Sequence, residues 1–447
     1  MANLNRRNFL KRAAVVAGAT AGAQYLGAPL IIADGKGPND TLGFACIGCG
    51  GQGTGNPGWA ASKGRLVAMV EVDDGKMADA AKKLGPKAEG VKQYFDFRKM
   101  LDECHKDIDC VLIATPDHTH APAAMRSMKL GKHVFVQKPM AHDIWEARQM
   151  AELAKEKKVM TQMGNQGHCG EGYRRLCEYI WGGAIGKVTE VHCWFNRNFG
   201  GNSPRPATKP VPPGVHWDEW LGPAAFREFH DGLHPFSWRN FWDFGTGTLG
   251  DMGCHIMDGA CWSLKLKHAD SVEAIQSKGG NKDYYPQNNI VKWSYPARGD
   301  MPPVTIFGND DKPEIFKEWE KKANREFKGG GSIYVGDKGV MYTETYGDGV
   351  RILPEEAHKA FPPPEKSIPR VKGGPLEDLL QAIKGGTPPC SNFVDYAGYF
   401  AEMVLLGRLA MRAGVGKKVD WDGPNMKTSV AGLEDVIKRE YRKGWEW

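Results

Sequence analysis

Short apolar runs alternate with helix-length amphipathic segments in the part of the chain that follows residue 41. A bounded apolar run of about four to eight residues is typical of a buried strand, and strands that alternate with helices predict a parallel sheet. Residues 41–165 are therefore expected to form a doubly wound α/β domain with helices on both faces of its sheet. Strands are expected at 42–47, 66–72, 91–95, 110–114, 133–136 and 159–163, and helices at 76–84, 97–104, 120–130 and 143–157.

Beyond residue 165 the pattern changes, because the strand-like runs lengthen and lose most of their interleaved helices. This predicts an α+β domain, residues 166–447, built on an open, mainly antiparallel sheet. Its helical segment 375–412 is expected to pack back on the first domain. Proline-rich loops are expected at 203–214 and 361–369, and strands at 186–196, 271–278, 289–295, 304–308, 332–335, 339–343 and 350–353.

The first strand ends in Gly48-x-Gly50-x-x-Gly53, with Gly51 and Gln52 inside the turn. A glycine turn between a strand and a helix lets the backbone approach a pyrophosphate at the helix N-terminus. The second strand carries Glu71, where an acid accepts the ribose hydroxyls of NAD and repels the 2′-phosphate of NADP. Asp73 is the rival acid, but Glu71 lies closer to the strand end. The sequence thus predicts a dinucleotide-binding Rossmann domain that prefers NAD.

Positive charge gathers at the N-terminus, while the formal charge of the whole chain is only +6. Residues 1–33 hold four positive and no negative side chains, so the remainder is close to neutral and nucleic-acid binding is not expected. Arg6 and Arg7 precede a mild apolar run, 13–23, which is too short for a convincing membrane span. This resembles a twin-arginine export signal, which predicts a partner in the twin-arginine machinery, a periplasmic location and no stable membrane insertion.

Ten cysteines and a histidine pair raise the question of a metal. Cys46-x-x-Cys49 straddles the glycine turn, where small residues are needed anyway, and the other cysteines lack paired zinc-ligand spacing. His118 and His120 follow the fourth strand without a matching set of carboxylates. We therefore expect buried free thiols and no bound metal.

Three clusters carry the expected chemistry. Thr115 and Pro116 follow the fourth strand, at the sheet edge where ligands bind in this architecture. Lys138 follows the fifth strand and can stabilise a carbinol oxygen as alkoxide. Asp251 and His255 are spaced i, i+4, which on a helix gives a carboxylate that supports a general-base imidazole. The same spacing is also compatible with a capped helix and a histidine that only serves packing.

In this order the glycine loop, Thr115-Pro116, Lys138-Pro139 and Asp251-x-x-x-His255 resemble the glucose–fructose oxidoreductase, inositol dehydrogenase and rhizopine catabolism family, in its exported bacterial branch. The resemblance implies NAD(P)-dependent oxidation or reduction at a carbinol carbon of a sugar, cyclitol or glycoside, with Lys138, Asp251 and His255 as catalytic residues. The usual Glu-Lys-Pro is Gln137-Lys-Pro here. The cofactor-binding set implied is Gly48, Gly50, Gly51, Gln52, Gly53, Glu71, Thr115, Pro116, His120, Gln137 and Lys138.

Polar and aromatic residues near the expected cleft form a set of possible substrate contacts, namely Asn165, Gln166, His168, Arg197, Trp238, Arg239 and Trp242. They offer the hydrogen-bonding groups and aromatic faces that suit a polyol. Two other functions stay open: a redox-neutral glycosidase or lyase that oxidises its sugar transiently with tightly bound NAD, and a non-catalytic sugar or nucleotide sensor. A homodimer or homotetramer through the open sheet is also expected.

Overall fold

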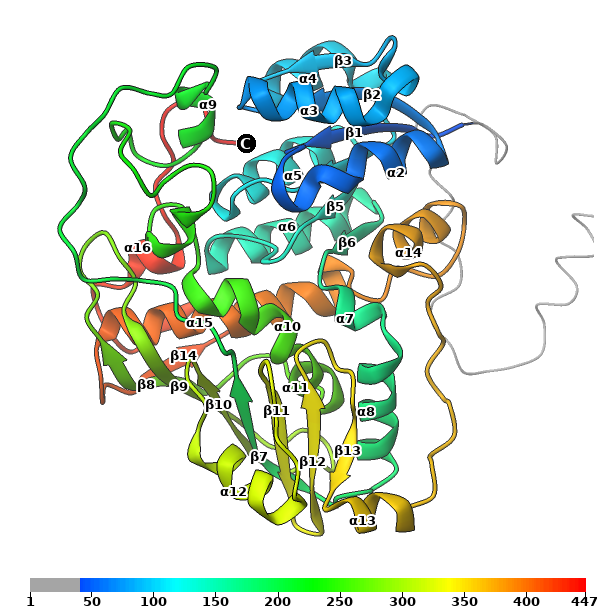
Figure 1. Cartoon of the computed structure of the whole chain (residues 1–447), viewed down its shortest axis with the longest axis vertical. Coiled ribbons are helices and arrows are strands. Elements are labelled where there is room, and N and C mark those ends of the chain that lie inside the picture. Colours follow the sequence, from blue (N-terminus) through cyan, green and yellow to red (C-terminus); the bar gives the residue numbers. More distant parts are fainter. Residues whose placement is uncertain (1–40) are drawn as a thin grey trace, which may run out of the picture. The chain divides into compact units, whose positions relative to one another are not determined.

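The computed structural model describes residues 41–447, which belong to one compact unit (Figure 1). The expected export signal, residues 1–33, lies outside the described residues. The first sheet is parallel, with strand order β3-β2-β1-β4-β5-β6. Its strands are β1 Gly43–Ile47, β2 Arg65–Val70, β3 Lys92–Tyr94, β4 Cys110–Ile113, β5 His133–Val136 and β6 Thr161–Met163.

The helices between these strands are α2 Asn56–Lys63, α3 Asp74–Leu84, α4 Phe97–Cys104, α5 His120–Lys129 and α6 Ile144–Lys157. Aspartates begin three of them, because a carboxylate can accept the unpaired N–H groups of a first helical turn. Asp73 caps α3, Asp96 caps α4, and Asp143 forms a capping box with Glu146 at α6. The predicted Rossmann-type sheet is confirmed, with strand bounds within two residues of those expected.

The second sheet has the order β13-β12-β11-β7-β10-β9-β8-β14-β15 and is antiparallel except for the β7–β10 pair. This confirms the mainly antiparallel second sheet. Its strands are β7 Val188–Trp194, β8 Ser271–Lys278, β9 Gln287–Tyr295, β10 Val304–Asn309, β11 Gly331–Gly336, β12 Gly339–Glu344, β13 Arg351–Leu353, β14 Val419–Asp422 and β15 Lys427–Thr428.

The remaining helices are α7 Gln166–Cys169, α8 Glu171–Trp181, α9 Trp217–Leu221, α10 Cys254–Ile256, α11 Asp258–Ser263, α12 Glu314–Ala323, α13 Glu355–Ala360, α14 Gly374–Ile383, α15 Gly398–Ala413 and α16 Glu434–Ile437. Glycines and prolines between 384 and 390 interrupt the predicted helical segment 375–412, because Pro cannot continue a helix. Leu379 and Leu380 of α14 pack with the strand residues Phe44 and Phe135 of the first sheet.

A shared apolar core joins the two sheets. Val136 and Met140 of the first domain belong to the same cluster as Leu249 and Phe400 of the second. Figure 1 shows α15 between the two sheets, with α6 on one side and β8 on the other. Among residues 41–447, no helix combines the length and apolar character needed to cross a membrane. The shared core fixes the carboxyl edge of the first sheet against the second domain, where the site is formed.

Candidate active site

The glycine turn packs tightly against the end of β4. Gly48 has a φ of +82°, and a Cβ there would lie 2.5 Å from the carbonyl oxygen of Ala114. A Cβ on Gly53 would lie 2.1 Å from the carbonyl oxygen of Gly48. Both separations are far below van der Waals contact, so only glycine fits at these two positions. The turn therefore holds backbone N–H groups at the edge of the sheet, as a bound pyrophosphate requires.

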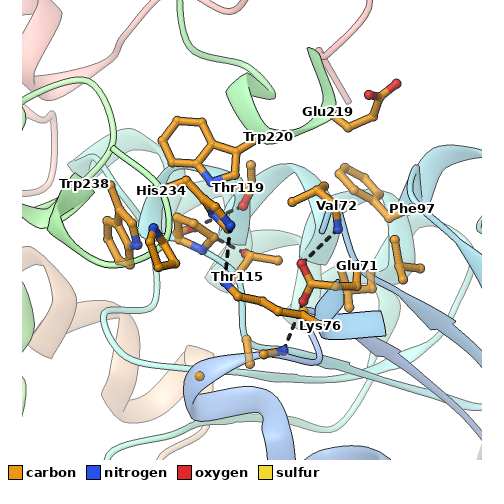
Figure 2. Close-up of a pocket in the computed structure, with 18 of the residues that line it drawn as sticks. Glu71, Val72, Lys76, Phe97, Thr115, Thr119, Glu219, Trp220, His234 and Trp238 are labelled. Atoms are coloured by element: carbon orange, nitrogen blue, oxygen red, sulfur yellow. Dashed lines mark hydrogen bonds between the residues drawn. The ribbon is translucent and has the colours of Figure 1, made fainter. Parts of the chain in front are cut away.

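Glu71 follows β2, and its carboxylate is held by the backbone around it. Oε2 accepts hydrogen bonds from the N–H groups of Cys49 (2.9 Å) and Gly50 (3.0 Å), and Oε1 accepts one from Val72 (2.9 Å). Figure 2 shows this carboxylate between the end of β2 and the glycine turn. The rival acid, Asp73, instead caps α3 and accepts a hydrogen bond from His234 at 2.7 Å. Of the two acids, Glu71 is thus the one whose carboxylate is bound by the glycine turn.

The glycine turn and Glu71 line a pocket of about 380 Å³. Gly50, Gly51 and Gln52 lie on its wall, and Thr115 and Pro116 lie on the wall formed by the end of β4. These positions agree with the cofactor-binding set expected from the sequence. A pocket lined by the glycine turn, Glu71 and the end of β4 fits a dinucleotide, with backbone N–H groups at the pyrophosphate and Glu71 at a ribose.

The opposite wall comes from the second domain, in the segment 214–239. The His216 N–H donates to the Val72 carbonyl (2.8 Å), and the His216 ring stacks on Phe95 with centroids 4.0 Å apart. His234 bonds Asp73 and lies 3.4 Å from Lys76 Nζ (Figure 2). Of this segment, the sequence analysis named only Trp238 and Arg239, as possible substrate contacts and not as part of the cofactor pocket. Residues that it missed on this wall are Glu219, Trp220, His234, Pro235, Phe236 and, from the C-terminal part, Trp445.

Four residues of the expected cofactor-binding set do not line this pocket, namely Gly53, His120, Gln137 and Lys138. His120 is buried, with Nδ1 2.7 Å from the Pro139 carbonyl oxygen and Nε2 2.9 Å from that of Thr115. It therefore links the loops that follow β4 and β5. This structural role takes the place of the contact with the cofactor that was expected from the sequence. The Gln137 side chain packs against Gly164, which follows β6. A Cβ on Gly164 would lie only 2.8 Å from Gln137 Oε1.

Lys138 follows β5 and is fixed by the second domain. Its Nζ donates to the backbone carbonyl of Asp251 (2.7 Å) and to Asp251 Oδ1 (3.2 Å). The same Oδ1 accepts a hydrogen bond from Arg239 Nε at 3.2 Å. Burial acts to raise the pKa of Asp251, but the charges of Lys138 and Arg239 outweigh it and hold that pKa below its usual value. Arg239 also lines the pocket, so it connects the pocket to the Lys138–Asp251 pair.

The expected pairing of Asp251 with His255 is not the one the structure makes. Asp251 lies in a π-helical turn, Leu249–Gly253, and its carboxylate is occupied by Lys138 and Arg239. His255, in α10, is buried, and its Nδ1 has no hydrogen-bond partner among residues 41–447. Lys138 and Arg239 reach the Asp251 carboxylate from other elements. Their charges interact with it more strongly than the nearby, uncharged His255 does.

His255 is accordingly an uncharged base. Burial and then the positive charge of Lys138 lower its pKa to about 3, against the opposing effect of Asp251. The edge of the ring meets Tyr346, with centroids 4.9 Å apart. Tyr346 is about two fifths exposed and comes from the loop after β12, an element for which the sequence offered no functional signal. The imidazole is therefore in its uncharged, proton-accepting form, in the electrostatic field of Lys138.

The residues expected to contact substrate divide into three groups. Asn165 and His168 are fully buried and donate to the carboxylate of Asp258 at 2.9 and 2.8 Å, so the prediction that they face the cleft is wrong. The Trp242 ring is buried too, and its Nε1 donates to the Tyr284 carbonyl (2.9 Å). Gln166 and Arg197 are exposed but do not line the pocket, whereas Trp238 and Arg239 do.

The Arg239 guanidinium lies over two aromatic rings at the pocket wall. It is 4.1 Å from the Trp238 ring centroid and 4.6 Å from that of Phe236. Phe236 is more than half exposed and was not among the site residues expected from the sequence. These cation–π contacts restrict the side chain that donates to Asp251.

Comparisons with known proteins bear on this site. Gfo/Idh/MocA models match twice: "Oxidoreductase family, NAD-binding Rossmann fold" at 42–165 and "Oxidoreductase family, C-terminal alpha/beta domain" at 184–295. The chain is 26% identical over 191 residues to levoglucosan dehydrogenase of Pseudarthrobacter phenanthrenivorans, across 42% of this chain and 40% of that protein. It is 29% identical over 128 residues to inositol 2-dehydrogenase of Salmonella typhimurium, across 28% and 37%. The chain thus aligns with about two fifths of the length of each relative.

The fold is also found in solved structures. The structure of the WlbA dehydrogenase from Bordetella pertussis, in complex with NADH and UDP-GlcNAcA, superposes with a TM-score of 0.59 at 15% identity. The superposition covers 86% of this chain and 99% of that one. At this identity the likeness concerns the fold. With the family match at 42–165, the first domain is an NAD-binding Rossmann domain.

Proposed function

Because the chain belongs to the Gfo/Idh/MocA oxidoreductase family, we propose that it transfers hydride between NAD and a carbinol carbon of a sugar, cyclitol or glycoside. The observation that carries this proposal is the Lys138–Asp251 pair. It joins the carboxyl edge of the Rossmann sheet to the second domain and is connected through Arg239 to the dinucleotide pocket. The two curated relatives described above are dehydrogenases of a sugar derivative and a cyclitol, which supports the substrate class.

Different side chains of this protein bind the cofactor and take part in the reaction. NAD, when bound, supplies the acceptor or donor of hydride. The glycine turn and Glu71 hold the cofactor, and the segment 214–239 keeps water from it. Lys138, fixed by Asp251, donates a hydrogen bond to the reacting oxygen and stabilises its negative charge. His255, neutral because it is buried, accepts the hydroxyl proton. Two domains thus position the substrate between them, which lowers the entropic cost of reaching the reactive geometry.

A nucleotide analysis followed by a substrate panel tests this function. Mild denaturation of the purified protein, with mass spectrometry of the supernatant, should identify NAD or NADH. Sugars, cyclitols and glycosides are then added one at a time, and both NADH and sugar products are followed. Net NADH formation supports the dehydrogenase. Product without net NADH favours the redox-neutral glycosidase, and nucleotide binding without product from any of them favours a sensor. A protein that neither carries nor binds NAD would contradict the proposal.

We propose separately that Arg6 and Arg7 direct export through the twin-arginine route, on the basis of the sequence alone. Replacing both by lysine keeps the charge and removes the guanidinium pair, so the variant should accumulate in the cytoplasm while the parent protein reaches the periplasm. Cell fractionation with marker enzymes for each compartment measures this. Replacement of Lys11 and Arg12 is the matched control and should leave export largely intact. A parent protein confined to the cytoplasm would refute the signal.

A further inference from the structure

Two cysteines from distant parts of the chain lie in contact with each other. Cys169 is the last residue of α7, and Cys390 lies in the loop after α14. Their sulfur atoms are 3.4 Å apart. Cys169 is buried, whereas Cys390 is partly open to solvent. The pair is therefore in contact and accessible from one side.

We propose that Cys169 and Cys390 are a disulfide-forming pair that covalently links α7 to the loop after α14. A disulfide bond is about 2.05 Å long, so the two sulfurs need to approach each other by roughly 1.4 Å. Small rotations about the Cα–Cβ bonds supply a movement of this size. The link would join residues 221 positions apart in the sequence.

The backbone around both cysteines is already held in place, next to Cys169 by Arg174 Nη1, which donates to the Gly170 carbonyl at 3.0 Å. The Cys390 N–H donates to Asp378 Oδ2 at 2.8 Å. Next to it, Ser391 Oγ donates to Asn165 Oδ1 at 2.7 Å, and the Ser391 N–H donates to Gln162 Oε1 at 3.1 Å. Anchors on both sides of the sulfur pair keep it together in the reduced protein, so the cross-link forms between groups that are already ordered.

The two thiols differ in a way that assigns their roles. Either sulfur could be the donor in this contact; the interaction with Cys169 lowers the pKa of Cys390, while the pKa of Cys169 is raised. The thiolate is the reactive form in disulfide exchange. Cys390 is therefore the attacking sulfur and Cys169 the resolving one, consistent with the greater exposure of Cys390.

With oxidised glutathione as oxidant the reaction balances. The Cys390 thiolate attacks one sulfur of the glutathione disulfide, breaks that S–S bond, and releases one glutathione thiolate while a mixed disulfide forms. Cys169 then loses its proton and attacks Cys390 Sγ, which releases the second glutathione. The protein loses two protons and two electrons, and the oxidant becomes two molecules of reduced glutathione.

A metal ion is the competing occupant of this position. Within residues 41–447, Cys169, Asp378 and Cys390 are the group whose ligand atoms lie close enough to share one, all within 4.8 Å. Structural zinc sites are closed by four protein ligands, and this group supplies three. The Asp378 carboxylate also already accepts the Cys390 N–H. These observations favour the disulfide, and metal content becomes an outcome of the test.

Peptide mapping tests the proposal on the full-length protein. After incubation with oxidised glutathione and blocking of free thiols, tryptic digestion without reductant should yield peptides 159–174 and 385–408 joined, two hydrogens lighter than their sum. Reduction should separate them. Cys261→Ala, which removes a buried thiol elsewhere, is the matched control and should leave the joined peptide unchanged. Separate peptides with both thiols blocked would overturn the proposal.

Stability gives a second readout. Closing so long a loop should raise the Tm of the oxidised over the reduced protein by about 5 °C. Cys390→Ala and Cys169→Ala should each abolish that difference. If zinc co-purifies with the protein in a one-to-one ratio and is lost in both Cys390→Ala and Cys169→Ala, the pair is a metal site and the disulfide proposal is wrong. These outcomes do not depend on which sugar the enzyme oxidises.

Discussion

Replacing Lys138 by alanine should lower turnover by about 100- to 10,000-fold while NAD still binds with near-normal affinity. The ammonium is held by two oxygens of Asp251, so it stands ready to stabilise an oxyanion and has no part in the wall of the dinucleotide pocket. Turnover is measured on a substrate found in the panel, and NAD affinity by calorimetry. Lys138→Met, which keeps most of the side-chain volume, should behave as the alanine variant does.

The matched control for this experiment is Lys155→Ala, which removes an exposed lysine on the outer part of α6 and should leave turnover unchanged. His255→Ala should show a loss of similar size. The double variant should lose much less than the product of the two single losses, because the two groups act on one oxygen and its proton. Near-normal turnover in both single variants would place the chemistry elsewhere.

The pH profile of kcat/KM examines the state of His255 in the same set of measurements. Its lowered pKa, about 3, means that the imidazole stays uncharged and able to accept a proton as the pH falls from 8 to roughly 5. The profile should therefore show no loss of activity near the usual histidine value in this range. A decline with an apparent pKa near 6.5 that disappears in His255→Ala would show that Asp251 supports the imidazolium after all.

Replacing Glu71 by serine should shift the preference between NAD and NADP by on the order of 100-fold toward NADP, about 2.7 kcal/mol. The carboxylate repels a 2′-phosphate in a partly closed pocket, and its removal takes that repulsion away. It also frees the N–H groups of Cys49 and Gly50, which then face the pocket together with the Lys76 side chain. Free N–H groups and a cation attract a phosphate.

Dissociation constants for both nucleotides, measured by calorimetry, give the shift directly. Asp79→Asn removes one negative charge from the exposed face of α3 and is the matched control, for which the ratio should not change. Wild-type protein that binds NADP more tightly than NAD would contradict the role given to Glu71. So would a Glu71→Ser protein that folds normally and keeps the original ratio.

Local chemistry in the sequence was enough for the Rossmann sheet, its glycine turn and the acid after β2. The apolar run Gly43–Ile47 is completely buried, and Gly48 and Gly53 leave no room for a Cβ. Such features depend on a few consecutive residues, so they are visible in the sequence itself. The resemblance of the ordered motifs to a known family also predicted Lys138 as a catalytic residue. Its place after a strand can likewise be recognised from a few neighbouring residues.

Tertiary structure alone decided which groups are partners. Helical spacing predicted that Asp251 pairs with His255. In the structure, Lys138 lies in the segment after β5, 113 residues away in the sequence, and it contacts the Asp251 carboxylate together with Arg239. His168 looked like a cleft residue until the chain brought Asp258 to it, 90 residues away. Tertiary structure also decided that Trp220 and His234 form a wall of the dinucleotide pocket. The free energy of a buried charge depends on the nearest opposite charge and on the exclusion of water, and both are set by contacts between distant segments, which sequence spacing does not contain.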